Sequence, residues 1–107
     1  MKMILMLQQW KMIAALLRRA QSRLPTPSEE AREEFENAVA LAMDYLDHNE
    51  LELALDSLAD AAELVPSRGG IWRDLERAAQ TMELHAKAAY LRQKFEESLS
   101  RVHGPGG

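Results

Sequence analysis

The sequence predicts an all-α protein, a single domain built as a small bundle of about five helices. Three observations support this. Apolar residues make up 47% of the 107 residues, which is enough for one modest core. They recur at intervals of three and four, and no segment shows the strict alternation typical of a strand. The few Gly and Pro residues are clustered. We therefore expect one helical domain over residues 1–103 and a disordered tail over 104–107.

The first expected helix, residues 2–24, is basic and amphipathic, with five cations and no acid. Polar residues interrupt its apolar run, so it is too short for a membrane span and lacks the features of a signal peptide. We expect a cytoplasmic protein. The stripe predicts a core face, or alternatively the seam of a homodimer; binding to a membrane surface or to a partner's groove stays open. The stripe consists of Met3, Met6, Trp10, Ile13, Leu17, Ala20 and Leu24.

An acidic helical hairpin should follow over residues 27–65. Thr26, Pro27 and Glu29 have the spacing of a capping box and predict a helix over about 27–47. A turn at 48–49 leads to a third helix, for which Asn49 is the expected N-cap. Pro66 ends that helix.

A C-terminal pair of helices is expected over residues 71–102. Ile71, Trp72 and Leu75 begin the apolar stripe of the first of them. Continuing the same helical phase would bury His85 and Gln93, whereas a shifted phase buries Leu84, Ala88, Leu91, Phe95 and Leu99. The sequence therefore predicts a break near residues 82–84, although no Gly or Pro marks it.

Residues 33–66 resemble a tetratricopeptide repeat, a pair of antiparallel helices whose small residues allow close packing. Ala38 and Leu58 depart from the pattern, because a Trp and an aromatic residue are usual at these positions. The resemblance implies a repeat-like helical hairpin and a role as an adaptor that binds a peptide or a partner helix. The matching positions are Ala38, Leu41, Ala42, Tyr45, Ala54, Leu58, Ala61 and Pro66.

A second resemblance concerns the segments "YLDHNELELALDSL" and "IWRDLERAAQTMEL". These are similar to segments of small acidic helical immunity proteins from bacterial polymorphic toxin systems. This resemblance implies a role, the inhibition of a toxin by stoichiometric binding, and it does not specify the binding residues.

Catalytic and metal chemistry find little support in the sequence. The chain has no cysteine, and His48, His85 and His103 lie far apart without the spacing of a zinc site. No glycine-rich phosphate loop or nucleophile motif is present. We expect no catalytic, cofactor-binding or metal-binding residues and a protein that is not an enzyme.

The segment 28–63 holds twelve acids and one base, Arg32. One interpretation is that these acids form the soluble side of two helices. A second is that Arg18, Arg19 and Arg23 neutralise them internally. A third interpretation is that these acids bind a basic protein partner. Like charges spaced four residues apart on a helix repel each other, and a basic partner would offset this repulsion. The same charge disfavours nucleic acid.

From these patterns we expect a protein-binding module, in the first place an immunity-type inhibitor that occludes the basic surface of a toxin or effector. A tetratricopeptide-like adaptor is the alternative. Acids would steer the encounter, and an aromatic side chain would anchor the partner. The candidate partner-binding residues are Glu33, Glu36, Asp44, Tyr45, Asp47, Glu52, Asp56, Asp60 and Trp72.

Overall fold

The computed structural model describes residues 2–67 and 69–102, and within them it confirms the all-α class. The predicted tail, 104–107, lies outside the described residues, as does His103. The described part of the chain forms five helices and no strand. The helices are α1 (Lys2–Ser22), α2 (Arg32–Asp47), α3 (Leu51–Glu63), α4 (Gly69–Thr81) and α5 (His85–Val102).

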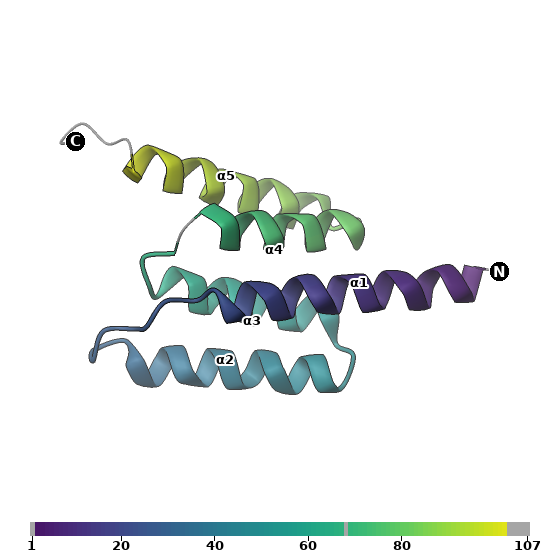
Figure 1. The fold of residues 1–107 in the computed structure, drawn as a ribbon, viewed down its shortest axis with the longest axis horizontal. Coiled ribbons are helices and arrows are strands. Elements are labelled where there is room, and N and C mark those ends of the chain that lie inside the picture. Colours follow the sequence, from purple (N-terminus) through teal and green to yellow (C-terminus); the bar gives the residue numbers. More distant parts are fainter. Residues whose placement is uncertain (1, 68, 103–107) are drawn as a thin grey trace.

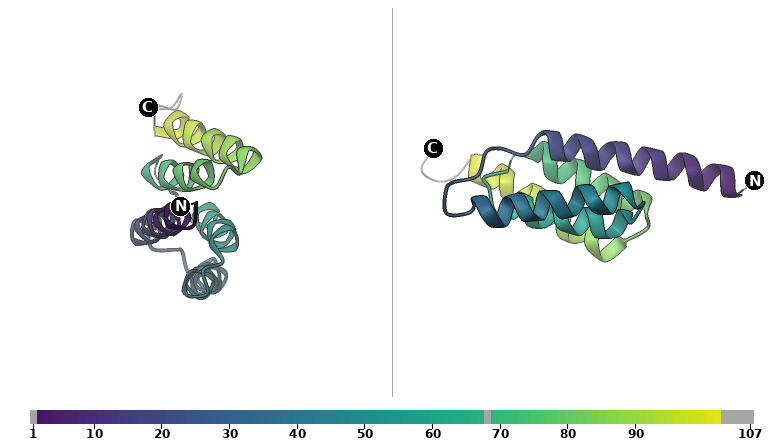
Figure 2. Two further views of the ribbon diagram at one scale, coloured as in Figure 1. Left: turned by 90° about the vertical axis from the view of Figure 1, so that its right-hand side faces the viewer. Right: turned by 90° about the horizontal axis from the view of Figure 1, so that it is seen from below.

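The helices form two antiparallel hairpins, α2–α3 and α4–α5, and α1 lies beside α3 and packs with it against α4 (Figure 1 and Figure 2). α1 packs against both α4 and α3, and α2 packs mainly against α3. Seen end-on, α5, α4, the pair α1 and α3, and finally α2 follow one another as layers (Figure 2). The N-terminal part of α1 extends beyond the other helices. α2 and α5 are thus the outermost helices.

The core lies where α1, α3 and α4 meet. Leu17, Leu55, Leu58, Leu75 and Leu91 are its largest fully buried side chains. Buried alanines surround them and allow the helices to approach closely, since a methyl group adds little bulk. The periodicity located these positions correctly. The alanines of the main cluster are Ala20, Ala42, Ala54, Ala62, Ala78, Ala79 and Ala88.

The start of α2 differs from the prediction. The helix begins at Arg32, five residues later than expected, and no side chain caps it. The capping box at Thr26 is therefore wrong. Pro27 disfavours the helical conformation of Thr26, so no helix begins before this proline, and residues 29–31 form turns ahead of α2. Ser28 instead accepts a long hydrogen bond from the Ala31 amide, at 3.4 Å.

α2 and α4 end in the same way, and this was not foreseen. The amide of Glu50 donates to the carbonyl of Tyr45 and the amide of Asn49 to that of Leu46, at 2.8 and 3.1 Å. These two bonds define a Schellman motif with Asn49 in the left-handed conformation, at φ 60°. Asn49 therefore terminates α2; it does not cap α3, whose N-cap position is occupied by Glu50 without a side-chain hydrogen bond.

The predicted break near residues 82–84 is confirmed, and its geometry is a second Schellman motif. The amide of Leu84 donates to the carbonyl of Ala79 at 2.9 Å, and that of Glu83 to Gln80 at 3.0 Å. Glu83 takes the left-handed position at φ 59°. Each hairpin is therefore closed by one left-handed residue that is not glycine.

Candidate partner-binding surfaces

The outer face of α2 carries the exposed acids that the sequence singled out. Glu33, Glu36, Asp44 and Asp47 are all exposed on this outermost helix. Leu41 lies on the same helix with 49% of its surface exposed. An exposed leucine with the carboxylate of Asp44 three residues further along the helix offers a partner both charge and an apolar contact.

These four acids differ in their partners. Arg18 of α1 approaches Asp47 at 3.7 Å, and the imidazole Nδ1 of His48 lies 3.6 Å from the Asp44 carboxylate. Among the side chains that the structure describes, Glu33 and Glu36 form no ion pair within 4.0 Å. The N-terminal half of α2 therefore keeps its negative charge free.

The acids of α3 are held from within the molecule. The ammonium of Lys87 on α5 lies 2.6 Å from Glu52 and 2.8 Å from Asp56. Burial lowers the pKa of Lys87, but the hydrogen bonds to Asp56 and Glu52 outweigh it and raise the pKa above its ordinary value. Lys87 therefore stays charged and binds both carboxylates at neutral pH.

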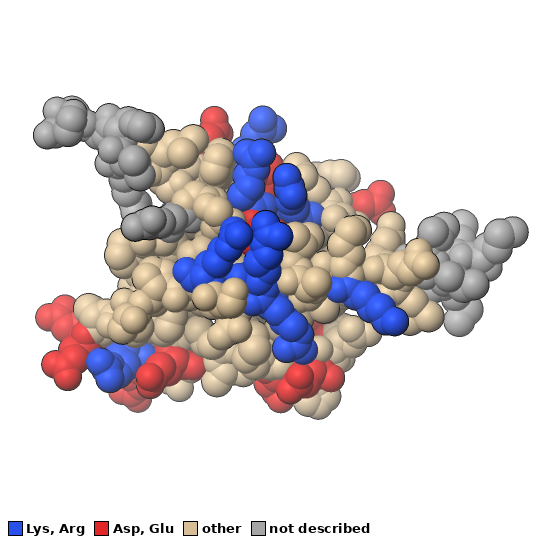
Figure 3. All heavy atoms as spheres, in the orientation of Figure 1, with Lys and Arg blue, Asp and Glu red and all other residues tan. Residues whose placement is uncertain are grey.

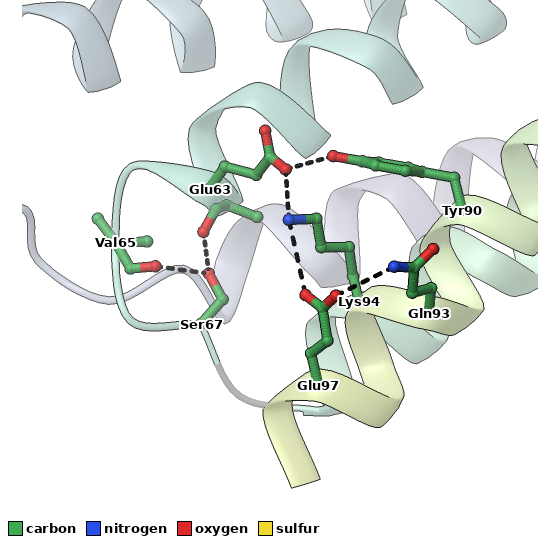
Figure 4. A network of polar contacts seen from close by, with 8 residues as sticks. Glu63, Val65, Ser67, Tyr90, Gln93, Lys94 and Glu97 are labelled. Carbon is green, nitrogen blue, oxygen red and sulfur yellow. Dashed lines mark hydrogen bonds and ion pairs between the residues drawn. The ribbon is translucent and has the colours of Figure 1, made fainter. Parts of the chain in front are cut away.

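A second network joins the end of α3 to α5 (Figure 4). Lys94 lies 2.9 Å from Glu63 and 3.8 Å from Glu97, and the Tyr90 hydroxyl donates a hydrogen bond to Glu63. The Tyr90 hydrogen bond, and then that of Lys94, lower the pKa of Glu63. Asp60, one turn away, shows the opposite: burial first, then the charges of Glu63 and Asp56, raise its pKa.

The arginines of α1 do neutralise acids within the molecule, but mainly Asp74 of α4, which lies outside the acidic segment 28–63. Of the three arginines considered, Arg18 alone pairs with α2. Arg19 and Arg23 both lie 3.3 Å from Asp74 of α4, whose side chain is only 3% exposed. The signal was present in the sequence, because Asp74 occupies the buried phase of its helix, between Ile71 and Ala78.

Two aromatic candidates have different surroundings. Trp72 is 5% exposed and belongs to the main core cluster, so its assignment as a partner-binding residue is wrong. Its indole fills the space at the start of α4, which leaves it no surface for a partner. Tyr45 is half-buried against the same cluster and keeps part of its ring accessible.

Positive charge gathers on a different part of the surface. In Figure 3, Lys and Arg side chains form a band over α1, α4 and α5, whereas the acids lie mostly along α2. On the face that Figure 3 shows, the two signs of charge are thus largely separated. No group of three or more His, Cys, Asp or Glu side chains in the described residues could hold a metal ion.

None of the described helices is long and apolar enough to cross a membrane. Comparisons of the chain with protein-family models, with curated proteins and with solved structures gave no match. The surfaces above therefore carry the functional argument by themselves.

Proposed function

We propose that the protein is a non-enzymatic binding module that inhibits a basic toxin or effector in the bacterial cytoplasm, in the manner of an immunity protein. One observation carries this proposal. α2, one of the two outermost helices, presents Glu33 and Glu36 without ion pairs among the described side chains, and the same helix exposes Leu41.

The inhibitor would act by occlusion. The acids of α2 attract a cationic surface and speed the encounter at low salt. Leu41 and the accessible part of Tyr45 would then enter an apolar pocket of the partner and supply most of the affinity. Glu52 and Asp56 contribute less in this mechanism, because a partner must first displace Lys87 from them.

The alternative function is an adaptor that holds a peptide or partner helix, and the arrangement in two helical hairpins favours it. In this case several clients would bind the same surface. An inhibitor should bind one dominant basic protein with fixed stoichiometry.

The first experiment is a pull-down from native lysate at low salt, eluted with a salt gradient and read by mass spectrometry. The inhibitor proposal expects one basic protein that is lost when Glu33→Lys and Glu36→Lys are combined. Glu83→Lys with Glu97→Lys is the matched control, with the same change of charge outside α2, and it should keep the partner. Recovery of several clients would favour the adaptor. If no protein is captured, or if the captured protein still binds the Glu33→Lys, Glu36→Lys variant, the inhibitor proposal is refuted and the acids of α2 serve only solubility.

A homodimer through helix 2–24 remains a separate proposal. Leu7 and Met12 are both 51% exposed and Trp10 is 38% exposed on α1, so part of the apolar surface of this helix stays uncovered in the single chain. Sedimentation velocity tests it: Leu7→Glu with Met12→Glu should convert a dimer to a monomer. A wild-type chain that sediments as a monomer at high concentration would refute the proposal.

A further inference from the structure

A groove between α4 and α5 collects three arginines. Its volume is about 450 Å3, and Arg73 and Arg77 of α4 line it together with Arg92 of α5. Phe95 and Leu99 form its apolar part. Leu99 was expected in the core, yet 44% of its surface is exposed. The groove therefore combines cations with an uncovered apolar surface.

The arginines of the groove form no ion pairs with the described carboxylates, although one of them packs on an aromatic ring. Within the described side chains, no carboxylate lies within 4.0 Å of the guanidinium of Arg73, Arg77 or Arg92, in contrast to Arg19 and Arg23 with Asp74. Arg73 lies over the Phe95 ring, 5.0 Å from its centroid, which holds the guanidinium at the edge of the groove. Its hydrogen-bond donors thus remain available to a ligand.

Guanidinium groups bind carboxylates through two parallel hydrogen bonds, and three of them close together favour a ligand with several carboxylates. Phe95 and Leu99 favour a ligand that also has an apolar side. We propose that the α4–α5 groove binds an acidic amphipathic segment of a partner protein, a helix with carboxylates on one face and leucine-like side chains beside them.

A nucleic acid fits this surface less well, although it is also anionic. The groove itself contains Glu76 and Glu96, and Glu76 is 8% exposed and accepts a hydrogen bond from Gln80 at 3.2 Å. The chain carries a net charge of −4, and the acids of α2 would repel a long polyanion. A short acidic helix needs to contact only the groove.

This inference does not depend on the proposed inhibitor function, because it concerns the opposite charge on different helices. If both hold, the protein can bind a basic partner through α2 and an acidic one through α4–α5. Each surface has its own variants, so the two proposals fail separately.

The test uses a fluorescein-labelled, 16-residue helical peptide of Glu, Ala and Leu, with Leu at every fourth position, titrated with the full chain at low salt. We expect a saturable rise in anisotropy. Arg73→Glu with Arg77→Glu should weaken binding by at least about tenfold, since it repels the carboxylates. Lys11→Glu with Arg18→Glu, which makes the same change of charge on α1, should leave it nearly unchanged.

Two further measurements make the result decisive. A peptide of Glu and Ala without Leu should bind several-fold more weakly, and equal binding would refute the apolar part of the proposal. A single-stranded oligonucleotide that binds the groove more tightly than the peptide would overturn the choice of partner. The absence of saturable peptide binding, or binding unaffected by Arg73→Gln with Arg77→Gln in a folded variant, would overturn the proposal as a whole.

Discussion

Arg19 of α1 and Asp74 of α4 form an ion pair in which the acid is buried and the base is not. The Nε atom of Arg19 lies 3.3 Å from Asp74, whose side chain is 3% exposed, while that of Arg19 is 55% exposed. Arg23 approaches the same carboxylate oxygen, also at 3.3 Å. A buried carboxylate without a cation is strongly unfavourable, so this pair of arginines helps to fix α1 on α4.

The effects of substituting the two arginines on the free energy of unfolding should therefore be non-additive. Arg19→Ala or Arg23→Ala alone should reduce the free energy of unfolding by about 1 kcal/mol or less, because the other base remains. The double variant leaves Asp74 unpaired and should cost about 3 kcal/mol. Urea denaturation followed by circular dichroism measures all three. Arg18→Ala, which loses only the exposed pair with Asp47, is the control and should change stability by less than about 0.5 kcal/mol. Additive losses would mean that Asp74 is solvated.

Glu83 offers a gain in stability. It occupies the left-handed position of the Schellman motif that ends α4, a conformation that favours glycine over residues with a β-carbon. Glu83→Gly should raise the free energy of unfolding by about 1 kcal/mol, measured by thermal or urea denaturation. Glu83→Gln keeps the β-carbon and removes the charge, and it should be close to neutral. Gln80→Gly, inside the same helix, should destabilise by about 1 kcal/mol. A Glu83→Gly variant no more stable than Glu83→Gln would contradict the role assigned to backbone strain.

The sequence predicted the helices well where apolar periodicity determines them. Leu17, Leu55 and Leu75 follow that pattern and are fully buried. The break before α5 was found in the same way, because the buried phase shifts there. Helix ends were less predictable. Asn49 had the residue type of an N-cap, but also that of a left-handed C-terminal residue, and local sequence does not decide between them.

The polar contacts could be predicted only in part, because they join residues far apart in the chain. Lys87 lies 31 residues beyond Asp56, and nothing local shows that α5 returns to α3. The acids of the hairpin were correctly placed on exposed faces, yet their charge is partly balanced by a helix that the sequence did not connect with them. Asp74 was recognisable by its buried phase, whereas its bases on α1 were not.

The two tryptophans should report the difference between core and surface. Trp72 is 5% exposed and Trp10 is 38% exposed. In a Trp10→Phe variant the remaining fluorescence should be blue-shifted and poorly quenched by acrylamide, and in Trp72→Phe it should be red-shifted and readily quenched. Trp72→Ala should cost about 3–5 kcal/mol, because it leaves a cavity in the core. Readily quenched fluorescence from Trp72 in the folded Trp10→Phe variant would reopen its assignment to a partner surface.

Two neighbouring acids at the end of α3, Glu63 and Asp60, should make the free energy of unfolding depend on pH in opposite directions. The pKa of Glu63 is lowered from its ordinary 4.5 by the Tyr90 hydroxyl and by Lys94, so its ionised form stabilises the fold above pH 4.5. That stabilisation is lost as the pH falls through the pKa of the folded state. Asp60 has its pKa raised from 3.8 by burial and by Glu63 and Asp56, so its ionisation costs no stability below pH 3.8, and the cost builds up as the pH rises from 3.8 through the raised value.

At pH 7, Glu63→Gln should therefore lower the free energy of unfolding, and Asp60→Asn should raise it. The difference for Glu63→Gln should shrink as the pH falls below 4.5 and vanish only below the lowered pKa of the folded state. The difference for Asp60→Asn should shrink as the pH falls through the raised pKa and vanish below 3.8. Below these limits each wild-type side chain is neutral in both states. Urea denaturation at a series of pH values between 2.5 and about 7 measures this. Tyr90→Phe is the informative control, because it removes the largest cause of the Glu63 shift and should reduce the effect of Glu63→Gln while leaving that of Asp60→Asn in place. If Glu63→Gln and Asp60→Asn change the free energy of unfolding in the same direction at pH 7, then the contacts of Glu63 with Tyr90 and Lys94 do not distinguish it from Asp60, and the prediction is wrong.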